Sequence, residues 1–277
     1  MKHYTSRTSN MWTWRNLWRP IESRPSIPDD LWRAALAHLT YCQALDTDTQ
    51  ARLRKLALRF LRAKTFEGAA GLRLTDAMRV HVALQACLLI LNLDFDYYAG
   101  WHAVILYPGD FRVSKEHVDE AGVVHHWHEE LSGESWEQGP VILSWDAAVA
   151  PSDGHTNIVL HEFAHKLDMR NGAADGCPPL PPGVSRATWA REFQAAYEEF
   201  CTALDRDEPV RIDDYAGESP AEFFAVLSEA FFLAPAVVQS DLPAVYRQLV
   251  AFYRQDPFAV FEGLGIRGAG EGELGRK

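Results

Sequence analysis

Cysteine is scarce in this chain, and its few cysteines lie far apart. The 277 residues include 4 cysteines, at Cys42, Cys87, Cys177 and Cys201, and no Cys-x-x-Cys pair. A thiolate metal site needs closely spaced cysteines and a disulfide framework needs many of them, so the sequence argues against both. Reduced thiols are typical of the cytoplasm, and we therefore predict a cytoplasmic protein.

The sequence also lacks a hydrophobic run long enough to cross a membrane. Its most apolar stretch, Val80–Leu93, is shorter than the roughly 20 residues that a spanning helix needs, and it carries His81, Gln85 and Asn92. We predict a buried core helix there and no association with membranes. Residues 1–20 mix tryptophan with arginine and lack the apolar segment of a signal peptide.

Positive charge is in deficit. There are 27 lysines and arginines against 38 aspartates and glutamates, which gives a formal net charge of -11. Such a charge repels phosphate backbones, so nucleic acid is not an expected partner. The segment Gly68–Gly71 lacks the Gly-Lys-Ser/Thr ending of a phosphate-binding loop, and we interpret it as a turn.

The chain does contain enough apolar residues to form a core. The spacing of these residues also changes clearly along the sequence. Apolar residues recur at helical spacing near both ends of the chain, and shorter apolar runs typical of strands lie in the middle. The predicted helices cover residues 31–42, 49–64, 75–91, 156–169, 186–204, 219–233 and 242–253, and the predicted strands cover residues 102–107, 123–128 and 141–145. We predict a mostly helical α+β fold: a helical N-terminal layer, a small mixed β-sheet, a helix over residues 156–169 and further C-terminal helices.

No repeat or strong linker divides the chain, so we expect one domain over residues 21–262. It follows a Trp-rich arm at residues 1–20 and precedes a flexible, glycine-rich tail at residues 263–277. We expect the proline-rich loop at residues 171–185 to border a site. The four N-terminal tryptophans either form a partner-binding surface or pack over the helices, and packing is the commoner role of buried aromatics; they are Trp12, Trp14, Trp18 and Trp32.

The chemistry is carried by the segment His161-Glu162-Phe163-Ala164-His165. On a helix, residues four apart project from one face, so His161 and His165 can bind one metal ion. Glu162 is rotated by about 100° from His161 and can act as a base on water beside the metal. Short patterns also arise by chance, but two unpartnered histidines on a buried helix are unfavourable without a metal. We therefore predict that residues 156–169 form a zincin-type active-site helix, with one zinc ion per chain.

The third ligand has several candidates. The pattern that places a histidine six residues after His165 is excluded, because Asn171 stands there. Asp168 shares a helix face with the two histidines, and Glu222 and Glu229 share a face of the predicted helix at residues 219–233. A carboxylate from a packed neighbouring helix can complete a tetrahedron, whereas Asp168 is better placed to orient a histidine. Spacing alone does not decide among them.

Two segments, Leu160–Met169 and Ser219–Phe232, resemble the Mlc titration factor A family of bacterial zinc peptidases. Segments Lys64–Asp76, Leu131–Trp145 and Phe252–Pro257 also resemble that family, whose catalytic fold is similar to the protease domain of anthrax lethal factor. The resemblance covers residues 20–260. It implies that Glu222 is the third zinc ligand.

The same resemblance implies a role for Tyr215 in stabilising the transition-state oxyanion, to which its phenol can donate a hydrogen bond. The alternative is a buried aromatic with a satisfied hydroxyl. The reaction that follows is metal-assisted hydrolysis, in which zinc polarises the scissile carbonyl and Glu162 moves the proton from water to the leaving amine. We expect the strand at residues 141–145 to form a sheet edge to which a peptide adds.

A second histidine group, His125, His126 and His128, is a candidate for another metal site. Side chains alternate along a strand, so His125 points away from the other two, and we favour a solvated hairpin.

The family resemblance implies aminopeptidase-like activity on small peptides. It also implies binding to the transcriptional repressor Mlc, so one alternative is a regulator that sequesters a repressor without catalysis. A purely structural zinc, with four protein ligands, is a further alternative.

Overall fold

Helices form the N-terminal part of the computed structural model, which describes residues 20–118, 124–131, 133–135, 139–150, 156–172 and 174–265. They are η1 (Ile21–Ser23), α2 (Asp29–Leu36), α3 (Thr40–Ala44), α4 (Thr47–Ala63), α5 (Asp76–Leu89) and the short η2 (Phe95–Tyr98). Helix α4 begins after Asp46 and α5 after Thr75, and each of these side chains accepts a hydrogen bond from a backbone N–H of the first turn. Both helices therefore start at conventional N-caps.

The single helix predicted over residues 31–42 is wrong, because the structure has α2 and α3 there with a break between them. At the break Leu39 has extended backbone angles, φ -125° and ψ 112°, and its side chain is buried. Turning the chain at Leu39 places this side chain in the core, and burying a leucine stabilises the fold by about 1.5–3 kcal/mol. No glycine or proline marks this break in the sequence.

Helix α5 is buried along almost its whole length, which confirms the predicted core helix. No helix within the described ranges is both long and apolar enough to span a bilayer. Trp32 on α2 is buried in the core, so this tryptophan packs. Trp12, Trp14 and Trp18 lie outside the described residues.

A small mixed sheet follows, as predicted. Its strands are β1 (Thr65–Gly68), β2 (Ala103–Tyr107), β5 (Gly133–Ser135) and β6 (Val141–Ser144), and their order across the sheet is β1-β2-β6-β5. Strands β1, β2 and β6 are parallel, and β5 pairs antiparallel with β6. The parallel pair β1 and β2 is joined through α5, because parallel strands need a long crossover.

The predicted sheet edge at residues 141–145 is wrong. Strand β6 lies between β2 and β5, so the edge on this side of the sheet is β5, and Trp145 already belongs to the next helix. Strands β1 and β5 were absent from the prediction because each is only three or four residues long. Such short strands are defined by their pairing partners and leave little periodicity in the sequence.

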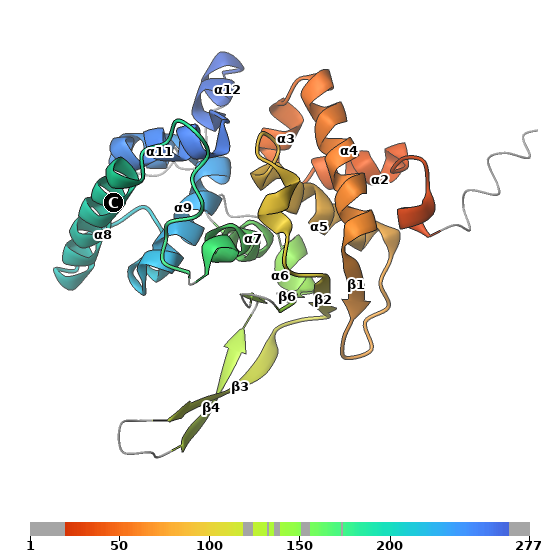
Figure 1. The fold of residues 1–277 in the computed structure, drawn as a ribbon, viewed down its shortest axis with the longest axis horizontal. Helices are drawn as coiled ribbons and strands as arrows, with labels where there is room; N and C mark the ends of the chain where they lie inside the picture. Colours follow the sequence, from red (N-terminus) through yellow and green to blue (C-terminus); the bar gives the residue numbers. More distant parts are fainter. Residues whose placement is uncertain are drawn as a thin grey trace, which may run out of the picture.

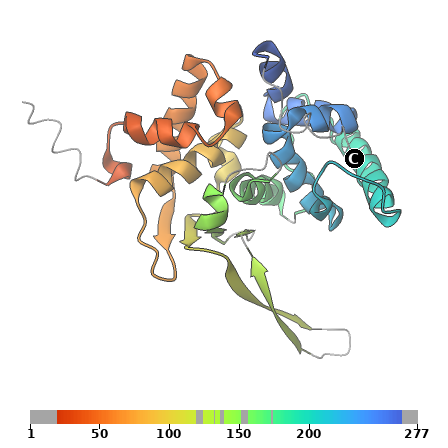
Figure 2. The same ribbon diagram turned by 180° about the vertical axis from the view of Figure 1, so that it is seen from behind.

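Strands β3 (Phe111–Val118) and β4 (Val124–Leu131) pair with each other as an antiparallel hairpin. In Figures 1 and 2 the hairpin extends away from the rest of the molecule. The backbone of His125, His126 and His128 belongs to β4, while the side chains of this histidine group lie outside the described part of the structure.

Helices form the rest of the chain. They are α6 (Trp145–Val149), α7 (Ile158–Asp168), η3 (Met169–Asn171), α8 (Arg186–Asp205), η4 (Asp214–Gly217), α9 (Pro220–Leu233), α10 (Pro235–Asp241), α11 (Pro243–Tyr253) and α12 (Pro257–Gly263). The four long helices predicted here are present as α7, α8, α9 and α11. The prediction missed the short helices α6, α10 and α12, none of which is longer than about two turns.

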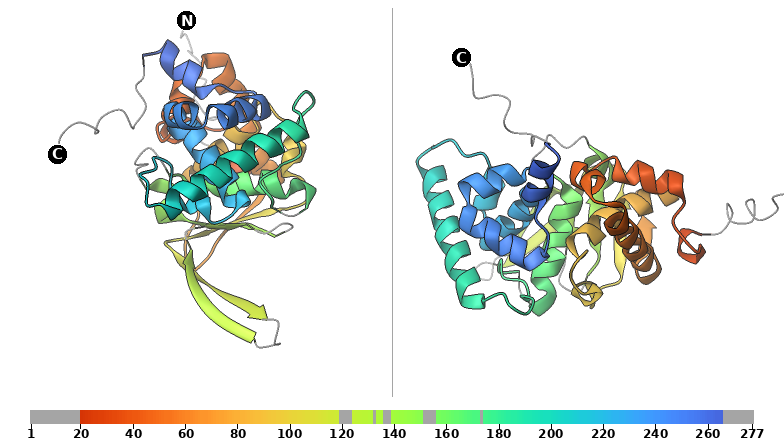
Figure 3. Two further views of the ribbon diagram at one scale, coloured as in Figure 1. Left: turned by 90° about the vertical axis from the view of Figure 1, so that its left-hand side faces the viewer. Right: turned by 90° about the horizontal axis from the view of Figure 1, so that it is seen from above.

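Helix α7 occupies the centre of the molecule. It lies between the N-terminal helices and the group formed by α8, α9 and α11, with the sheet beneath it (Figure 1), and the view from above shows the same arrangement (Figure 3). Among the core-facing side chains of α7 is Phe163, whose ring contacts those of Phe60, Tyr98 and Trp101. This aromatic cluster fixes the rotation of α7 about its axis, because aromatic pairs prefer defined geometries.

Candidate functional site

The first half of the site is set by how α7 begins. Asn157 is the N-cap, and its side-chain oxygen accepts a hydrogen bond from the Leu160 N–H at 2.9 Å. The helix then continues without glycine or proline to Asp168. With Phe163 packed into the core, His161 and His165 project from the opposite side of the helix, one turn apart.

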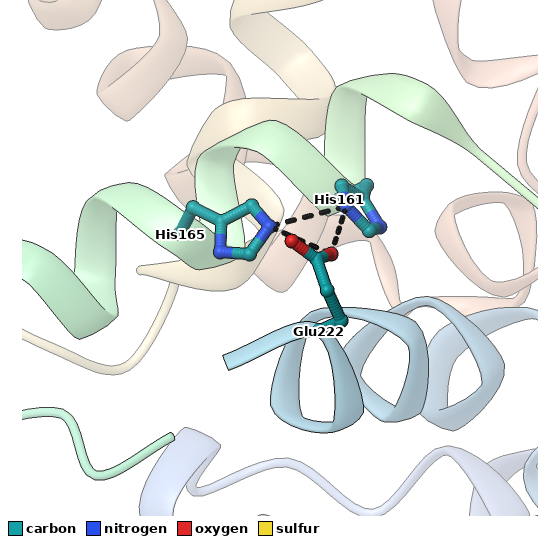
Figure 4. Close-up of side chains that lie close together, drawn as sticks. All are labelled: His161, His165 and Glu222. Atoms are coloured by element: carbon teal, nitrogen blue, oxygen red, sulfur yellow. Dashed lines mark hydrogen bonds and ion pairs between the residues drawn. The ribbon is translucent and has the colours of Figure 1, made fainter. Parts of the chain in front are cut away.

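The second half of the site is the start of α9. Ser219 is its N-cap and accepts a hydrogen bond from the Glu222 N–H at 3.1 Å, and Pro220 occupies the first turn, where a missing N–H is tolerated. This start places Glu222 in the first turn of α9. Figure 4 shows its carboxylate pointing at the two imidazoles of α7.

The three side chains converge on one point. Glu222 Oε2 lies 3.0 Å from His161 Nε2 and 3.1 Å from His165 Nε2, and the two Nε2 atoms are 3.1 Å apart. A tetrahedral metal ion with bonds of about 2.0–2.1 Å holds its donor atoms about 3.3 Å apart. The observed triangle is close to that size, so two imidazoles and one carboxylate fit such an ion.

Within the described residues, the side chains of His161, His165 and Glu222 are close enough together to hold one metal ion. Of the three acidic candidates, Glu222 is the one whose carboxylate contacts both Nε2 atoms. Glu229 lies behind His161, where its Oε1 is 2.7 Å from Nδ1. Asp168 instead accepts a hydrogen bond from the Gly176 N–H at 2.7 Å, in the loop that follows α7.

Charge in the site is concentrated on buried groups. Both imidazoles are buried, and burial alone opposes protonation of His161, but hydrogen bonds to Glu222 and Glu229 outweigh it and raise the pKa of that imidazole. Burial likewise opposes ionisation of Glu222, but the hydrogen bonds from the two histidines prevail and lower the pKa of its carboxyl to about 2. Glu222 is therefore an anion facing the space between the rings.

Glu162 is buried beside these groups and lies against the edge strand of the sheet. A Cβ placed on Gly133 of β5 would be 2.5 Å from Glu162 Oε1 and 2.7 Å from Glu162 Cγ. It would also be 2.7 Å from Ile158 Cδ1, so no side chain fits at position 133 unless Glu162 and Ile158 both move. The prediction did not identify Gly133, because its proximity to Glu162 depends on the pairing of β5 with β6.

Tyr215 lies on η4, just before α9, and its ring centroid is 6.0 Å from that of His161. Its side chain is 48% exposed, so the alternative of a buried aromatic is wrong. The backbone N–H of Tyr215 donates to Asp213 Oδ1 at 3.0 Å, which holds the turn. The ring of Tyr215 is thus an exposed neighbour of His161.

Some partners of the site were not predicted. Asn157 donates from Nδ2 to Gln85 Oε1 of α5 at 2.7 Å, and its backbone N–H donates to Glu229 Oε2. Helix caps can be recognised in a sequence, so Asn157 had a detectable signal as the residue before α7. Its contacts with α5 and α9 join residues 72 positions apart in the chain, and no local pattern in the sequence indicates them.

Several known proteins are similar to this chain in sequence. The sequence model of the family described as "Glucose-regulated metallo-peptidase M90" matches residues 11–254. A protein named Mlc titration factor A from Klebsiella pneumoniae is 36% identical over 269 residues, which cover 94% of this chain and 97% of that protein. Proteins of the same name from Salmonella arizonae and Yersinia pestis are 40% and 39% identical, covering 83% and 82% of this chain and 92% and 85% of the respective relatives.

The match extends over most of this chain and most of each relative, and it includes both helices that form the three-donor group. The resemblance to the Mlc titration factor A family is thereby confirmed. The chain belongs to the glucose-regulated metallo-peptidase M90 family.

Proposed function

We propose that this chain is a zinc-dependent peptidase that hydrolyses short or unstructured peptides, with one zinc ion per chain. His161, His165 and Glu222 hold the ion. The observation that carries the proposal is their triangle of donor atoms, 3.0–3.1 Å on each side, beside a buried Glu162. Within the described residues three donors converge, which supports a catalytic site with a position for water over a structural site with four protein ligands.

When bound, zinc supplies Lewis-acid activation of water and of the scissile carbonyl. Glu162 takes the proton from the attacking water and passes it to the leaving amine, the usual task of a general base and acid. Tyr215 donates its phenolic hydrogen to the carbonyl oxygen as negative charge develops there. The support for this role is the exposed position of Tyr215 beside His161.

We propose that the substrate peptide pairs with the edge strand β5. An edge strand offers unpaired backbone groups to an extended peptide. The support is the proximity of β5 to Glu162 at Gly133, which brings a paired peptide to the base without an intervening side chain. This replaces the earlier expectation that the strand at residues 141–145 receives the peptide.

The finer parts of the proposal rest on the family resemblance. We propose aminopeptidase-like activity on small substrates, action in the cytoplasm, and a catalytic unit formed by residues 21–262 between the N-terminal arm and the tail. The family description as a metallo-peptidase supports peptide hydrolysis over the non-catalytic alternative.

A second function is supported by the names of the relatives, which call them titration factors of Mlc. We propose that this chain also binds the repressor Mlc. Binding and hydrolysis need not share residues, so a variant without catalysis separates them.

The test of the main function is peptide hydrolysis by three forms of the protein: zinc-loaded wild type, chelator-treated wild type and zinc-loaded Glu162→Gln. We expect activity in the first form and a decrease of about 100- to 10,000-fold in Glu162→Gln, the range for loss of a general base. The chelator-treated form should regain activity when zinc is restored. Undiminished hydrolysis by Glu162→Gln contradicts the role of the base, and retained Mlc binding by this variant shows that binding needs no catalysis.

A further inference from the structure

Behind His161, on the side away from Glu222, lies a second buried carboxylate, Glu229. Its Oε1 is 2.7 Å from His161 Nδ1, and its side chain is almost fully buried. Glu222 and Glu229 are seven residues apart on α9, two turns along one face, so one helix presents a carboxylate to each nitrogen of the same ring.

A hydrogen bond from Nδ1 to a carboxylate decides which ring nitrogen keeps its proton. With Nδ1 donating to Glu229, Nε2 is the ring nitrogen that faces the three-donor group, 3.0 Å from Glu222 Oε2. The same bond fixes the ring plane. A metal at the three-donor group would therefore meet His161 with its ring already oriented and with Nδ1 engaged elsewhere, which leaves Nε2 as the nitrogen for coordination.

Glu229 is itself held from a second direction. Its Oε2 accepts a hydrogen bond from the backbone N–H of Asn157, the N-cap of α7. Asn157 in turn donates from its side chain to Gln85 Oε1 on α5 at 2.7 Å, and Gln85 is buried. The carboxylate thus has both oxygens engaged and cannot rotate away from His161 without losing the hydrogen bond from the Asn157 N–H.

We infer that Glu229 is the positioning residue of the metal site, and that Asn157 and Gln85 connect it to the N-terminal helices. The inference rests on the proposed function, because it assigns to Glu229 a role in zinc binding. Glu229 does not contact the reacting atoms. It acts through His161, and its effect is expected first in zinc affinity and only through that in hydrolysis.

The test is the zinc dissociation constant of chelator-treated protein, measured by competition with a chromophoric chelator. Loss of such an outer hydrogen bond weakens metal binding by about 10- to 100-fold, which is the decrease expected for Glu229→Ala. Glu229→Gln keeps the side-chain shape and one acceptor oxygen for His161, while its amide nitrogen then faces the Asn157 N–H, so it should bind zinc more tightly than Glu229→Ala but less tightly than wild type.

The matched control is Ser228→Ala, the preceding residue of α9. Ser228 is fully buried, its hydroxyl donates to the Phe224 carbonyl at 2.7 Å and it accepts a hydrogen bond from Tyr253 at 2.8 Å. This substitution removes buried hydrogen bonds from the same helix without touching His161. It is expected to lower the unfolding temperature and leave the zinc dissociation constant of the folded protein unchanged.

A spectroscopic readout separates positioning from general stability. In the cobalt-substituted protein the Nδ1–H proton of a coordinated histidine gives its own shifted NMR signal. The His161 signal should exchange slowly with solvent in wild type and be lost or broadened in Glu229→Ala, while Ser228→Ala leaves it in place.

The outcomes are distinguishable. If wild-type protein takes up no zinc, the proposed function fails together with this inference. If wild type binds zinc and Glu229→Ala and Glu229→Gln bind it equally well, the positioning role of Glu229 is overturned while the zinc site stands.

Discussion

The two imidazoles of α7 face the same partner in front and differ in what lies behind them. Both Nε2 atoms are 3.0–3.1 Å from Glu222 Oε2. Nδ1 of His161 is bound by Glu229 at 2.7 Å, whereas Nδ1 of His165 is buried and has no hydrogen-bond partner in the part of the chain that the structure describes. The first half of α7 is thus held more completely than the second.

The difference follows from the element that packs behind each ring. Behind His161 runs α9, a long helix whose Glu229 is fixed by the N-cap of α7. The second half of α7 is tied to a loop, where Asp168 Oδ2 accepts from Gly176 and Asp168 Oδ1 lacks a partner among the residues described. Side chains held by packed helices keep their geometry better than those held by loops. We therefore expect substitutions around the first half to have the larger effects.

Tyr215→Phe should have the largest effect on this side of the site. The ring contact with His161 is kept and only the phenolic hydroxyl is removed, so kcat for a peptide should fall by about 100- to 1,000-fold, the range for loss of one oxyanion donor. Zinc affinity should stay unchanged. Steady-state kinetics of zinc-loaded proteins measures this, and an unaltered kcat removes Tyr215 from the mechanism.

Gly133→Ala tests the close approach of β5 to Glu162. The added methyl group would overlap Glu162 Oε1, so the base must shift, and misplacement of a catalytic group by about 1 Å lowers the rate on the order of 100-fold. Zinc content should be unaffected, because Glu162 is not a ligand.

The control for this substitution is Gly263→Ala, where a Cβ meets no atom within 4 Å. Wild-type rates in Gly133→Ala with a folded, zinc-loaded protein would show that Glu162 does not depend on the space left by this glycine.

The pH dependence of stability tests the burial of His81, which lies on the same helix as Gln85. Burial lowers the pKa of His81 to about 4, although its hydrogen bond to the Ala148 carbonyl opposes this; the ring also contacts that of His38. Between pH 6.5 and 4 the unfolded chain binds a proton at His81 that the folded protein does not, so stability falls as the pH falls.

The contribution of His81 to this loss is at most on the order of 3 kcal/mol, and it is fully lost below pH 4. Urea unfolding of wild type and His81→Gln at several pH values measures it. We expect a shallower decrease in stability for the variant. If the stability of wild type and of His81→Gln falls with pH in parallel, His81 is not a neutral, buried residue in the folded protein.

Asp168→Asn should have the smallest effect on zinc binding. It tests most closely whether the second half of α7 is held less firmly than the first. Asparagine keeps an oxygen for the Gly176 N–H, and Asp168 makes no hydrogen bond to His165 in this structure. We expect its zinc dissociation constant to change by less than about threefold, well below the range for loss of an outer hydrogen bond to a ligand. A loss as large as that of Glu229→Ala would show that Asp168 holds His165 when the metal is bound.

Local patterns in the sequence predicted the helices that carry the site. The spacing of His161 and His165 is a property of one helix, and the caps Asn157 and Ser219 start α7 and α9 close to the predicted positions. The fold class and the core helix α5 were predicted for the same reason, since helical periodicity survives without knowledge of neighbours.

What the sequence did not predict depends on pairing between distant segments. The position of β5 at the sheet edge, and hence the contact of Gly133 with Glu162, follows from strand order. The choice among Asp168, Glu222 and Glu229 follows from how α9 packs on α7. Spacing placed Glu222 and Glu229 on one face of α9, and only the packing shows that one contacts Nε2 and the other Nδ1.

The most direct test of the account is the zinc content of purified protein after chelation and re-addition of zinc, measured by mass spectrometry of the metal in wild type and in Glu222→Ala. The account predicts one zinc ion per chain in wild type, with binding strongly weakened in the variant while the protein stays folded. A wild-type chain that takes up no zinc, or a variant that retains a full equivalent with wild-type affinity, contradicts it.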